Sequence, residues 1–344
     1  MTSIFATVGP SLRTPEAVRA AVSRGARGFR FPASKHDPAT LDTLAREVAA
    51  VAAELAVEVD LFLDLPGRKV RLISDEEVAL SEVAGLNIRY EAAGAPEGGD
   101  PSIPGVRLVG AAHMAPIAVG DVLLLGDGED ALRVAEAHPG HCFAVPLTGG
   151  RLGFRRGMAV QGKPHALAGL TERDMSTLST LSTTSFTGVF VSYVESASEV
   201  RKVQEILADS HREPPVVVAK VETSAGVADI EEIAGQADGV LLGRGDLLMD
   251  VGVLDFHAAS QRVVDHMAKS GKPLIVGTQL LTSLSDSWLP HRSEISCLCD
   301  LIAKGVTGLL LSDETTVGRD PGRTVQVLAE LISTYGTVGG ALFR

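Results

Sequence analysis

The sequence has little of three things: cysteine, aromatic side chains and positive charge. Only three of its 344 residues are cysteines, Cys142, Cys297 and Cys299, and aromatic residues make up 4%. An odd cysteine count without CxxC spacing argues against a disulfide framework or a zinc knuckle, and it is typical of the reducing cytoplasm, where we expect this protein. With so few aromatics, we expect a core of Val, Leu, Ile and Ala, which suits buried parallel strands.

The charge balance is acidic, with 31 Lys and Arg against 43 Asp and Glu and a formal net charge of −12. This argues against a nucleic-acid partner, because phosphate neutralisation needs clustered cations. A small anionic substrate is still compatible, since a few local cations can override a distant net charge. Residues 1–13 lack the marks of a secretory signal, and no apolar run approaches the ~20 residues that span a bilayer, so we expect no membrane association.

Short apolar runs, typical of strands, alternate with segments of helical periodicity. The predicted strands are 3–8, 28–33, 58–65, 188–193, 215–221, 239–243, 273–278 and 307–312. The predicted helices are 14–24, 38–56, 171–184, 196–209, 226–236, 255–270, 292–304 and 322–335. Eight strand signals, each followed by a helix signal, predict an α/β fold of the (β/α)8 TIM-barrel type.

One long segment breaks this alternation after the third strand. Short β-like runs separated by Gly, Pro and Asp fill it, and they predict a small β domain inserted into a βα loop. The predicted organisation is therefore a first barrel part at 1–68, an inserted β lid domain at 69–166 and the rest of the barrel at 167–344. Within the insert, Glu91–Pro104 is rich in Gly, Ala and Pro and is interpreted as a loop.

Polar residues gather where the predicted strands end, which is where barrels carry their chemistry. Lys220 and Glu222 end the fifth strand, and Asp246 follows the sixth. Lys220 fits either a structural ion pair or an active site, because ion-pair networks resemble active sites. Two carboxylates without a histidine cluster suit Mg²⁺ or Mn²⁺, which prefer oxygen ligands.

At this point the sequence resembles the pyruvate kinase family. The resemblance runs in order along nearly the whole chain, and the motifs that carry it share the strand ends of the predicted barrel and the borders of the insert. In the barrel they are Ala6–Ser11, Arg30–Phe31 with Ser34, Leu63–Gly67 with Arg71, Ala219–Glu222, Gly243–Leu247, Gly271–Pro273, Thr278–Leu281, Arg292–Glu294 and Leu311–Thr315. In the insert they are Gly120–Asp121, Asp127–Gly128, Leu152–Gly157 and Leu170–Glu172.

The resemblance implies phosphoryl transfer from phosphoenolpyruvate to ADP, giving pyruvate and ATP, with Mg²⁺ or Mn²⁺ as the metal. It implies that Glu222 and Asp246 hold the metal and that Lys220 neutralises charge on the phosphoryl group and the enolate. The remaining implied roles are phosphoryl, nucleotide or substrate contacts. They fall to Arg30, Arg71, Asp127 and Arg155 for the phosphates and nucleotide, and to Gly245, Asp246, Thr278 and Ser192 for the substrate, with Thr278 also near the face where the enolate is protonated.

The resemblance also implies that K⁺ is not required. Many members bind K⁺ through side-chain oxygens, but two of those positions here are Pro32 and Leu65, which have none. Lys69 stands where a Glu is usual and could supply a fixed ammonium group in place of the ion. We therefore interpret Lys69 as a surrogate for the monovalent cation, with a solvated hinge residue as the alternative.

Other departures put nucleotide binding in question. Residues that differ from the usual pattern are Lys35, Gly126, Glu195, Leu248, Asp313 and Val317. The family's C-terminal domain has no counterpart in this sequence, and the resemblance is compatible with a homo-oligomer. Two other functions are kept open: a lyase or other phosphotransferase acting on a pyruvate-like substrate, and a non-catalytic regulatory homologue.

Overall fold

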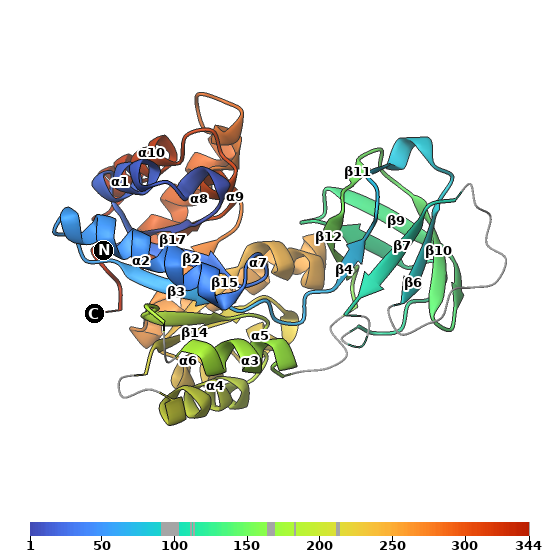
Figure 1. The fold of residues 1–344 in the computed structure, drawn as a ribbon, viewed down its shortest axis with the longest axis horizontal. Coiled ribbons are helices and arrows are strands. Elements are labelled where there is room, and N and C mark those ends of the chain that lie inside the picture. Colours follow the sequence, from blue (N-terminus) through green and yellow to red (C-terminus); the bar gives the residue numbers. More distant parts are fainter. Residues whose placement is uncertain are drawn as a thin grey trace. The chain divides into compact units, whose positions relative to one another are not determined.

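The computed structural model describes residues 1–90, 103–110, 112, 114–163, 169–181, 184–210 and 214–343. They form two compact units, each visible in Figure 1. The barrel unit comprises Met1–Gly67, Leu170–Arg244 and Ala258–Arg344, and the insert unit comprises Arg68–Gly169 and Gly245–His257. Most of the loop predicted at Glu91–Pro104 and the predicted end of the insert at 166 lie outside the described residues.

Eight parallel strands close the barrel unit in the order β1-β17-β16-β15-β14-β13-β3-β2. The fold class is therefore confirmed: a (β/α)8 barrel with a β domain inserted after its third strand. The barrel strands are β1 Ser3–Thr7, β2 Ala26–Pro32, β3 Asp60–Asp64, β13 Gly188–Val191, β14 Val216–Val221, β15 Gly239–Gly243, β16 Leu274–Gly277 and β17 Gly308–Leu311.

Helices surround these strands in the barrel unit (Figure 1). Side chains cap two of their first turns: Thr14 accepts from the N–H of Ala17, and Thr171 and Asp174 form a capping box. The helices are η1 Pro10–Leu12, α1 Pro15–Ser23, α2 Pro38–Glu54, α3 Glu172–Thr180, α4 Ala197–Ser210, α5 Ser224–Ala228, α6 Ile230–Gln236, η5 Thr282–Ser285, α8 Arg292–Ala303, α9 Asp313–Thr316 and α10 Pro321–Tyr335. Among the described helices, none combines the length and apolarity that crossing a bilayer requires.

Helix α7, Arg244–Ser270, begins eleven residues before the predicted segment 255–270. Its first part lies outside the strands and helices predicted from the sequence, which end at 243 and resume at 255. Gly252 has φ 78° and ψ 171°, so the helical path is kinked there. The difference matters because Gly245 and Asp246 lie in the first turn of a helix, where backbone N–H groups carry partial positive charge.

The inside of the barrel is packed with more aromatic surface than the composition suggests. Phe62 and Phe190 stack with ring centroids 4.4 Å apart, and Phe5 meets both rings at their edges. Valine and leucine side chains from neighbouring strands complete this cluster. The expected aliphatic core is therefore incomplete as a description, because three buried phenylalanines lie at the centre of the barrel.

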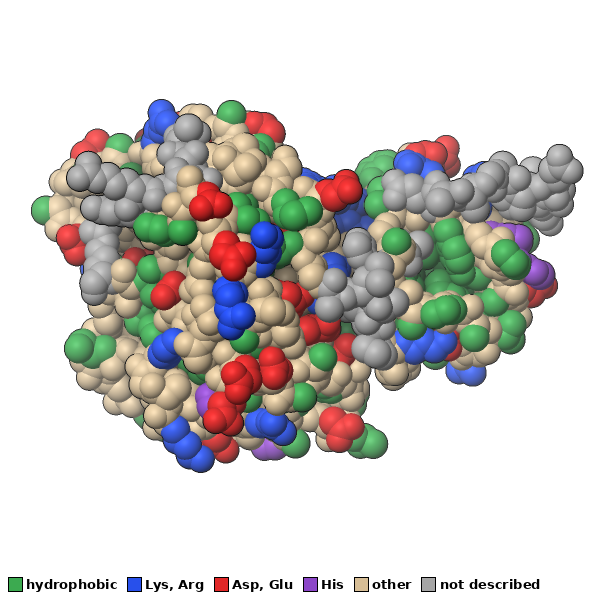
Figure 2. Space-filling model, turned by 90° about the horizontal axis from the view of Figure 1, so that it is seen from below, with side chains coloured by type: hydrophobic (Ala, Val, Ile, Leu, Met, Phe, Trp, Pro, Cys, Tyr) green, Lys and Arg blue, Asp and Glu red, His purple; other side chains and the backbone are tan. Residues whose placement is uncertain are grey.

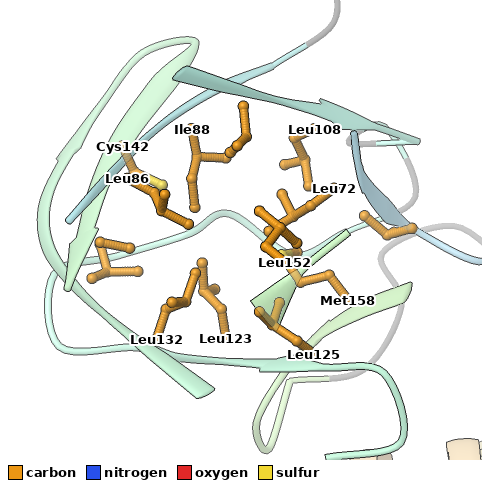
Figure 3. Packing of buried hydrophobic residues seen from close by; sticks show 14 of the residues in the cluster. Leu72, Leu86, Ile88, Leu108, Leu123, Leu125, Leu132, Cys142, Leu152 and Met158 are labelled. Carbon is orange, nitrogen blue, oxygen red and sulfur yellow. The ribbon is translucent and has the colours of Figure 1, made fainter. Parts of the chain in front are cut away.

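The insert unit is a second closed barrel, with strand order β10-β6-β7-β4-β12-β8-β9. Its strands are β4 Arg71–Ile73, β6 Leu86–Tyr90, β7 Gly105–Val109, β8 Val122–Leu125, β9 Asp130–His138, β10 His141–Pro146 and β12 Arg155–Val160; β5 Val78–Ala79 pairs with β11 Arg151–Leu152, and η2 is Leu80–Glu82. Leucine and valine side chains meet inside, with Cys142 and Met158 among them (Figure 3). The unit thus has a hydrophobic core of its own.

Candidate active site

Polar side chains of the barrel unit follow the apolar interior layer by a simple rule. Side chains two residues apart on a strand point the same way, so the residue after next in the chain also faces the barrel interior. Phe62 is followed by Asp64, Phe190 by Ser192, and Val218 by Lys220. Because all eight strands are parallel, these polar groups share the carboxyl-terminal rim, where TIM barrels carry their sites.

Asp64 lies between two cations at this rim. Its Oδ2 accepts from Arg30 Nη2 at 2.7 Å and Nε at 2.9 Å, and its Oδ1 lies 3.3 Å from Lys220 Nζ. Burial raises the pKa of the Asp64 carboxyl group, but Arg30 and Lys220 lower it by more, so its pKa lies below the usual value. Burial lowers the pKa of Arg30, but the charge and hydrogen bond of Asp64 together with the charges of Glu222 and Asp313 raise it by more. Both groups are therefore charged at neutral pH.

Lys220 is buried, with 8% of its surface exposed, and its ammonium group contacts three side chains. Its Nζ donates to Ser192 Oγ at 2.7 Å and lies 3.2 Å from Glu222 Oε1, in addition to its contact with Asp64. Ser192 in turn donates to the carbonyl of Leu65 at 2.7 Å. The position of the ammonium group is thus fixed, and the carboxylates of Asp64 and Glu222 balance its charge.

Glu222 is a buried carboxylate, 3% exposed, beside this ammonium group. Its Oε2 accepts from the backbone N–H of Tyr193 at 3.0 Å. A Cβ atom at Gly243 would come within 2.5 Å of its Oε1, so only glycine leaves room for the carboxylate there. A fixed oxygen donor of this kind suits a hard divalent cation such as Mg²⁺.

Thr278 follows β16 with a backbone that side chains rarely adopt. Its φ is 73°, and that of Gln279 is 51°. A positive φ is unusual for a β-branched residue and costs on the order of 1–3 kcal/mol, so it persists only where the surroundings enforce it. The sequence gives no sign of this strain.

Within the insert unit, Lys69 and Asp246 form an ion pair. Lys69 Nζ lies 3.1 Å from Asp246 Oδ1 and 3.3 Å from Oδ2, and both side chains are about one-fifth to one-quarter exposed. A Cβ atom at Gly157 would come within 2.8 Å of Lys69 Cε, so the glycine leaves room for the lysine stem. The predicted cation surrogate therefore contacts a predicted metal ligand.

The other predicted residues of the insert unit lie apart along its strands and turns. Arg71 begins β4 and is half-buried, Arg155 begins β12 and is exposed, and Asp127 is half-buried in the turn after β8. The backbone N–H of Asp127 donates to Glu129 Oε2 at 2.9 Å. Figure 2 shows acidic and basic side chains intermixed over the visible face of the barrel unit.

One connection within the site was missed from the sequence. Asp64 joins Arg30 to Lys220, a link that the sequence did not predict. A carboxylate that ends an apolar strand is the signal that could have identified it. Within the described parts of the chain, no three His, Cys, Asp or Glu side chains lie close enough to make a metal centre by themselves.

Comparison with known proteins identifies the family of this chain. A family model described as pyruvate kinase, barrel domain, matches residues 1–325. A pyruvate kinase of Aeropyrum pernix is 30% identical over 334 residues, which cover 96% of this chain and 70% of that protein. Pyruvate kinases of Thermococcus litoralis and Thermotoga maritima are 27% and 28% identical, covering 97% and 96% of this chain and 69% and 70% of theirs. The chain therefore belongs to the pyruvate kinase family and is a pyruvate-kinase-like enzyme.

Proposed function

We propose that this enzyme transfers a phosphoryl group between phosphoenolpyruvate and ADP, giving pyruvate and ATP, in the cytoplasm. The observation that carries the proposal is the buried ammonium group of Lys220, fixed by Ser192, Asp64 and Glu222 at the strand ends. Phosphoryl transfer depends mostly on positioning and charge neutralisation, and a fixed cation supplies both. The relatives that bear the name pyruvate kinase support the same reaction.

In this proposal the barrel unit supplies the cations for the anionic substrate. Lys220 neutralises charge on the transferring phosphoryl group and on the enolate oxygen that it leaves. Arg30 binds the phosphoryl oxygens through the guanidinium edge that does not face Asp64. Since each cation is already paired with a carboxylate, the rim can hold both without large repulsion.

The divalent ion, Mg²⁺ or Mn²⁺, would be held by Glu222 and Asp246, the two carboxylates that the family resemblance assigns to it. The buried position of Glu222 and the space left by Gly243 fit an oxygen ligand for such an ion. Sites of this kind commonly use one or two carboxylates and leave the other positions to water and substrate oxygens. When bound, the ion would act as a Lewis acid that neutralises charge on the phosphate oxygens.

Substrate binding and proton delivery fall to the rest of the predicted set. Backbone N–H groups in the first turn of α7, at Gly245 and Asp246, would bind the substrate carboxylate. The hydroxyl group of Thr278 would help to bind it and would pass its proton to C3 of the enolate while taking one from water in exchange, which completes pyruvate. Arg71, Asp127 and Arg155 would contact the nucleotide together with Arg30.

We further propose that the reaction does not require K⁺. Leu65 and Pro32 offer no side-chain oxygen, and the ammonium group of Lys69 would provide a permanent positive charge instead. The ion pair with Asp246 supports this role, because it shows that Lys69 reaches a carboxylate of the predicted site rather than open solvent.

The test is a coupled assay for pyruvate formation from phosphoenolpyruvate and ADP in the presence of Mg²⁺. Turnover is expected, and the Lys220→Met variant should abolish most of it. Mn²⁺ binding is measured by electron paramagnetic resonance. A protein that binds Mn²⁺ but shows no turnover would contradict the proposal. That outcome would favour enolate chemistry on another pyruvate-like substrate.

A further inference from the structure

The strained segment Thr278–Gln279 is held by an arginine that packs beside it. Arg244 follows β15, and Gly243 lies opposite Gly277 in the sheet, so the arginine side chain reaches the segment that follows β16. Its Nε donates to the carbonyl of Gly277 at 3.1 Å, and its Nη2 donates to the carbonyls of Thr278 and Gln279. One guanidinium group thus binds three consecutive carbonyls.

A carboxylate holds the same segment from its other end. Glu314 is 1% exposed, and its Oε1 accepts from the backbone N–H groups of Leu280 at 2.9 Å and Leu281 at 3.1 Å. Its Oε2 accepts from the N–H of Ser312 at 2.7 Å, which fixes the carboxylate to the end of the neighbouring strand. The carbonyl groups of Gly277 to Gln279 therefore contact the cation of Arg244. The N–H groups of the next two residues, Leu280 and Leu281, contact the anion of Glu314.

This arrangement accounts for the unusual backbone. Residues in sparsely populated conformations persist only where the surroundings over-determine them, and here charge-assisted hydrogen bonds fix both the carbonyls and the N–H groups. A lysine could not replace Arg244 fully, because an ammonium group lacks the planar fork that reaches several carbonyls at once. Nothing in this arrangement requires Arg244 or Glu314 to touch a substrate.

We propose that Arg244 and Glu314 are positioning residues that hold the hydroxyl group of Thr278 in the direction needed to protonate the enolate. The proposal rests on the function proposed above, in which Thr278 delivers that proton. In this proposal two charged residues that do not react themselves set the geometry of the protonation step. Misplacement of a reacting group by about 1 Å can cost roughly 10²-fold in rate, so loss of the hydrogen bonds made by Arg244 or Glu314 should lower the rate measurably.

The first measurement is independent of activity. Amide hydrogen exchange at Leu280 and Leu281 is expected to accelerate at least tenfold in Arg244→Met and in Glu314→Gln, while protection in the barrel strands is retained. The control is Cys297→Ala, which removes only the thiol that accepts from Arg244 Nη1 at 3.0 Å and leaves the carbonyl contacts intact. Unchanged exchange in both variants would overturn the proposal.

The second measurement follows proton delivery directly, as exchange of the methyl hydrogens of pyruvate with solvent deuterium. Arg244→Met should lower this rate and kcat by roughly 10²-fold, with KM for phosphoenolpyruvate changed less than threefold, and Arg244→Lys should restore part of the loss. Near-normal methyl exchange and kcat in Arg244→Met would overturn the proposal. If Arg244→Met does not fold, the same comparison between Arg244→Lys and wild type decides.

The two proposals fail in different ways. If the wild-type enzyme has no turnover but Arg244→Met still accelerates amide exchange, the proposed function is refuted. The role of Arg244 in holding the backbone of Thr278–Gln279 is then retained. A wild-type enzyme with turnover, whose Arg244 variants exchange and react normally, would refute the positioning role alone.

Discussion

Replacing Asp64 by Asn should destabilise the barrel unit by about 3–5 kcal/mol, the usual cost of removing one partner from a buried ion pair. The carboxylate is 5% exposed and contacts Arg30 at 2.7 Å and Lys220 at 3.3 Å. Asparagine keeps the size but not the charge. Two cations would then share the rim, and of the two carboxylates that contact Lys220 only Glu222 would remain.

Differential scanning calorimetry measures this loss. For a unit of this size each kcal/mol shifts Tm by about 2–4 °C, so a decrease of roughly 6–20 °C is expected. Glu54→Gln is the matched control, because its carboxylate pairs with Arg19 on the exposed surface, where such pairs contribute about 0–1 kcal/mol. An Asp64→Asn variant within 1 kcal/mol of wild type would refute the reasoning, since it would mean that water screens the rim.

The same variant predicts a pH dependence. The pKa of Asp64 is lowered in the folded protein, so its contribution is fully present above the unfolded pKa of about 3.9 and is lost as pH falls through the folded value. The stability difference between wild type and Asp64→Asn should therefore be largest near neutrality and should shrink below about pH 4. A difference that stays constant from pH 7 to pH 3 would contradict this assignment.

Three further outcomes are expected. Lys220→Met should lower kcat by roughly 10²–10³-fold, as loss of other preorganised electrostatic groups does, and near-normal kcat in the coupled assay would remove Lys220 from the mechanism. Activity should be flat when KCl replaces tetramethylammonium chloride at equal ionic strength, whereas a steep rise with KCl would exclude Lys69 as the cation surrogate. Burial raises the pKa of Cys142 to about 11, so iodoacetamide at pH 8 should label the partly exposed Cys297 and Cys299 first; equal labelling of Cys142 by mass mapping would show that the core of the insert unit opens.

Much of the barrel could be predicted because its pattern is local. Apolar runs of strand length and helical segments with Thr14 or Thr171 as caps carry the alternation without any knowledge of distant contacts. The same regularity predicts that Lys220 and Glu222 lie at the rim. The start of α7 could not be predicted in this way, because Gly245 and Gly252 have low helix propensity and Gly252 interrupts the helical backbone.

The connections within the site were harder to predict than its members. Asp64 is separated from Lys220 by more than 150 residues, and nothing in either segment specifies that the two side chains meet. The strain at Thr278 is likewise invisible in the sequence, because it depends on hydrogen bonds that Arg244 donates and Glu314 accepts, and both residues belong to other segments. Local patterns therefore identify the parts, while their pairings depend on how the strands are ordered around the barrel.

That strand order also determines which contacts can form first during synthesis. β1 pairs with β17, so Ser3 meets Gly308, and the first strand has one of its two neighbours only after some 300 further residues have been synthesised. The insert unit, by contrast, draws its whole hydrophobic core from residues 70–160. Contacts between distant residues form slowly, because the long loop between them must first be closed. During synthesis the inserted barrel can therefore complete its core while the barrel that contains it is still open, with the edges of β1 and its apolar neighbours accessible to chaperones.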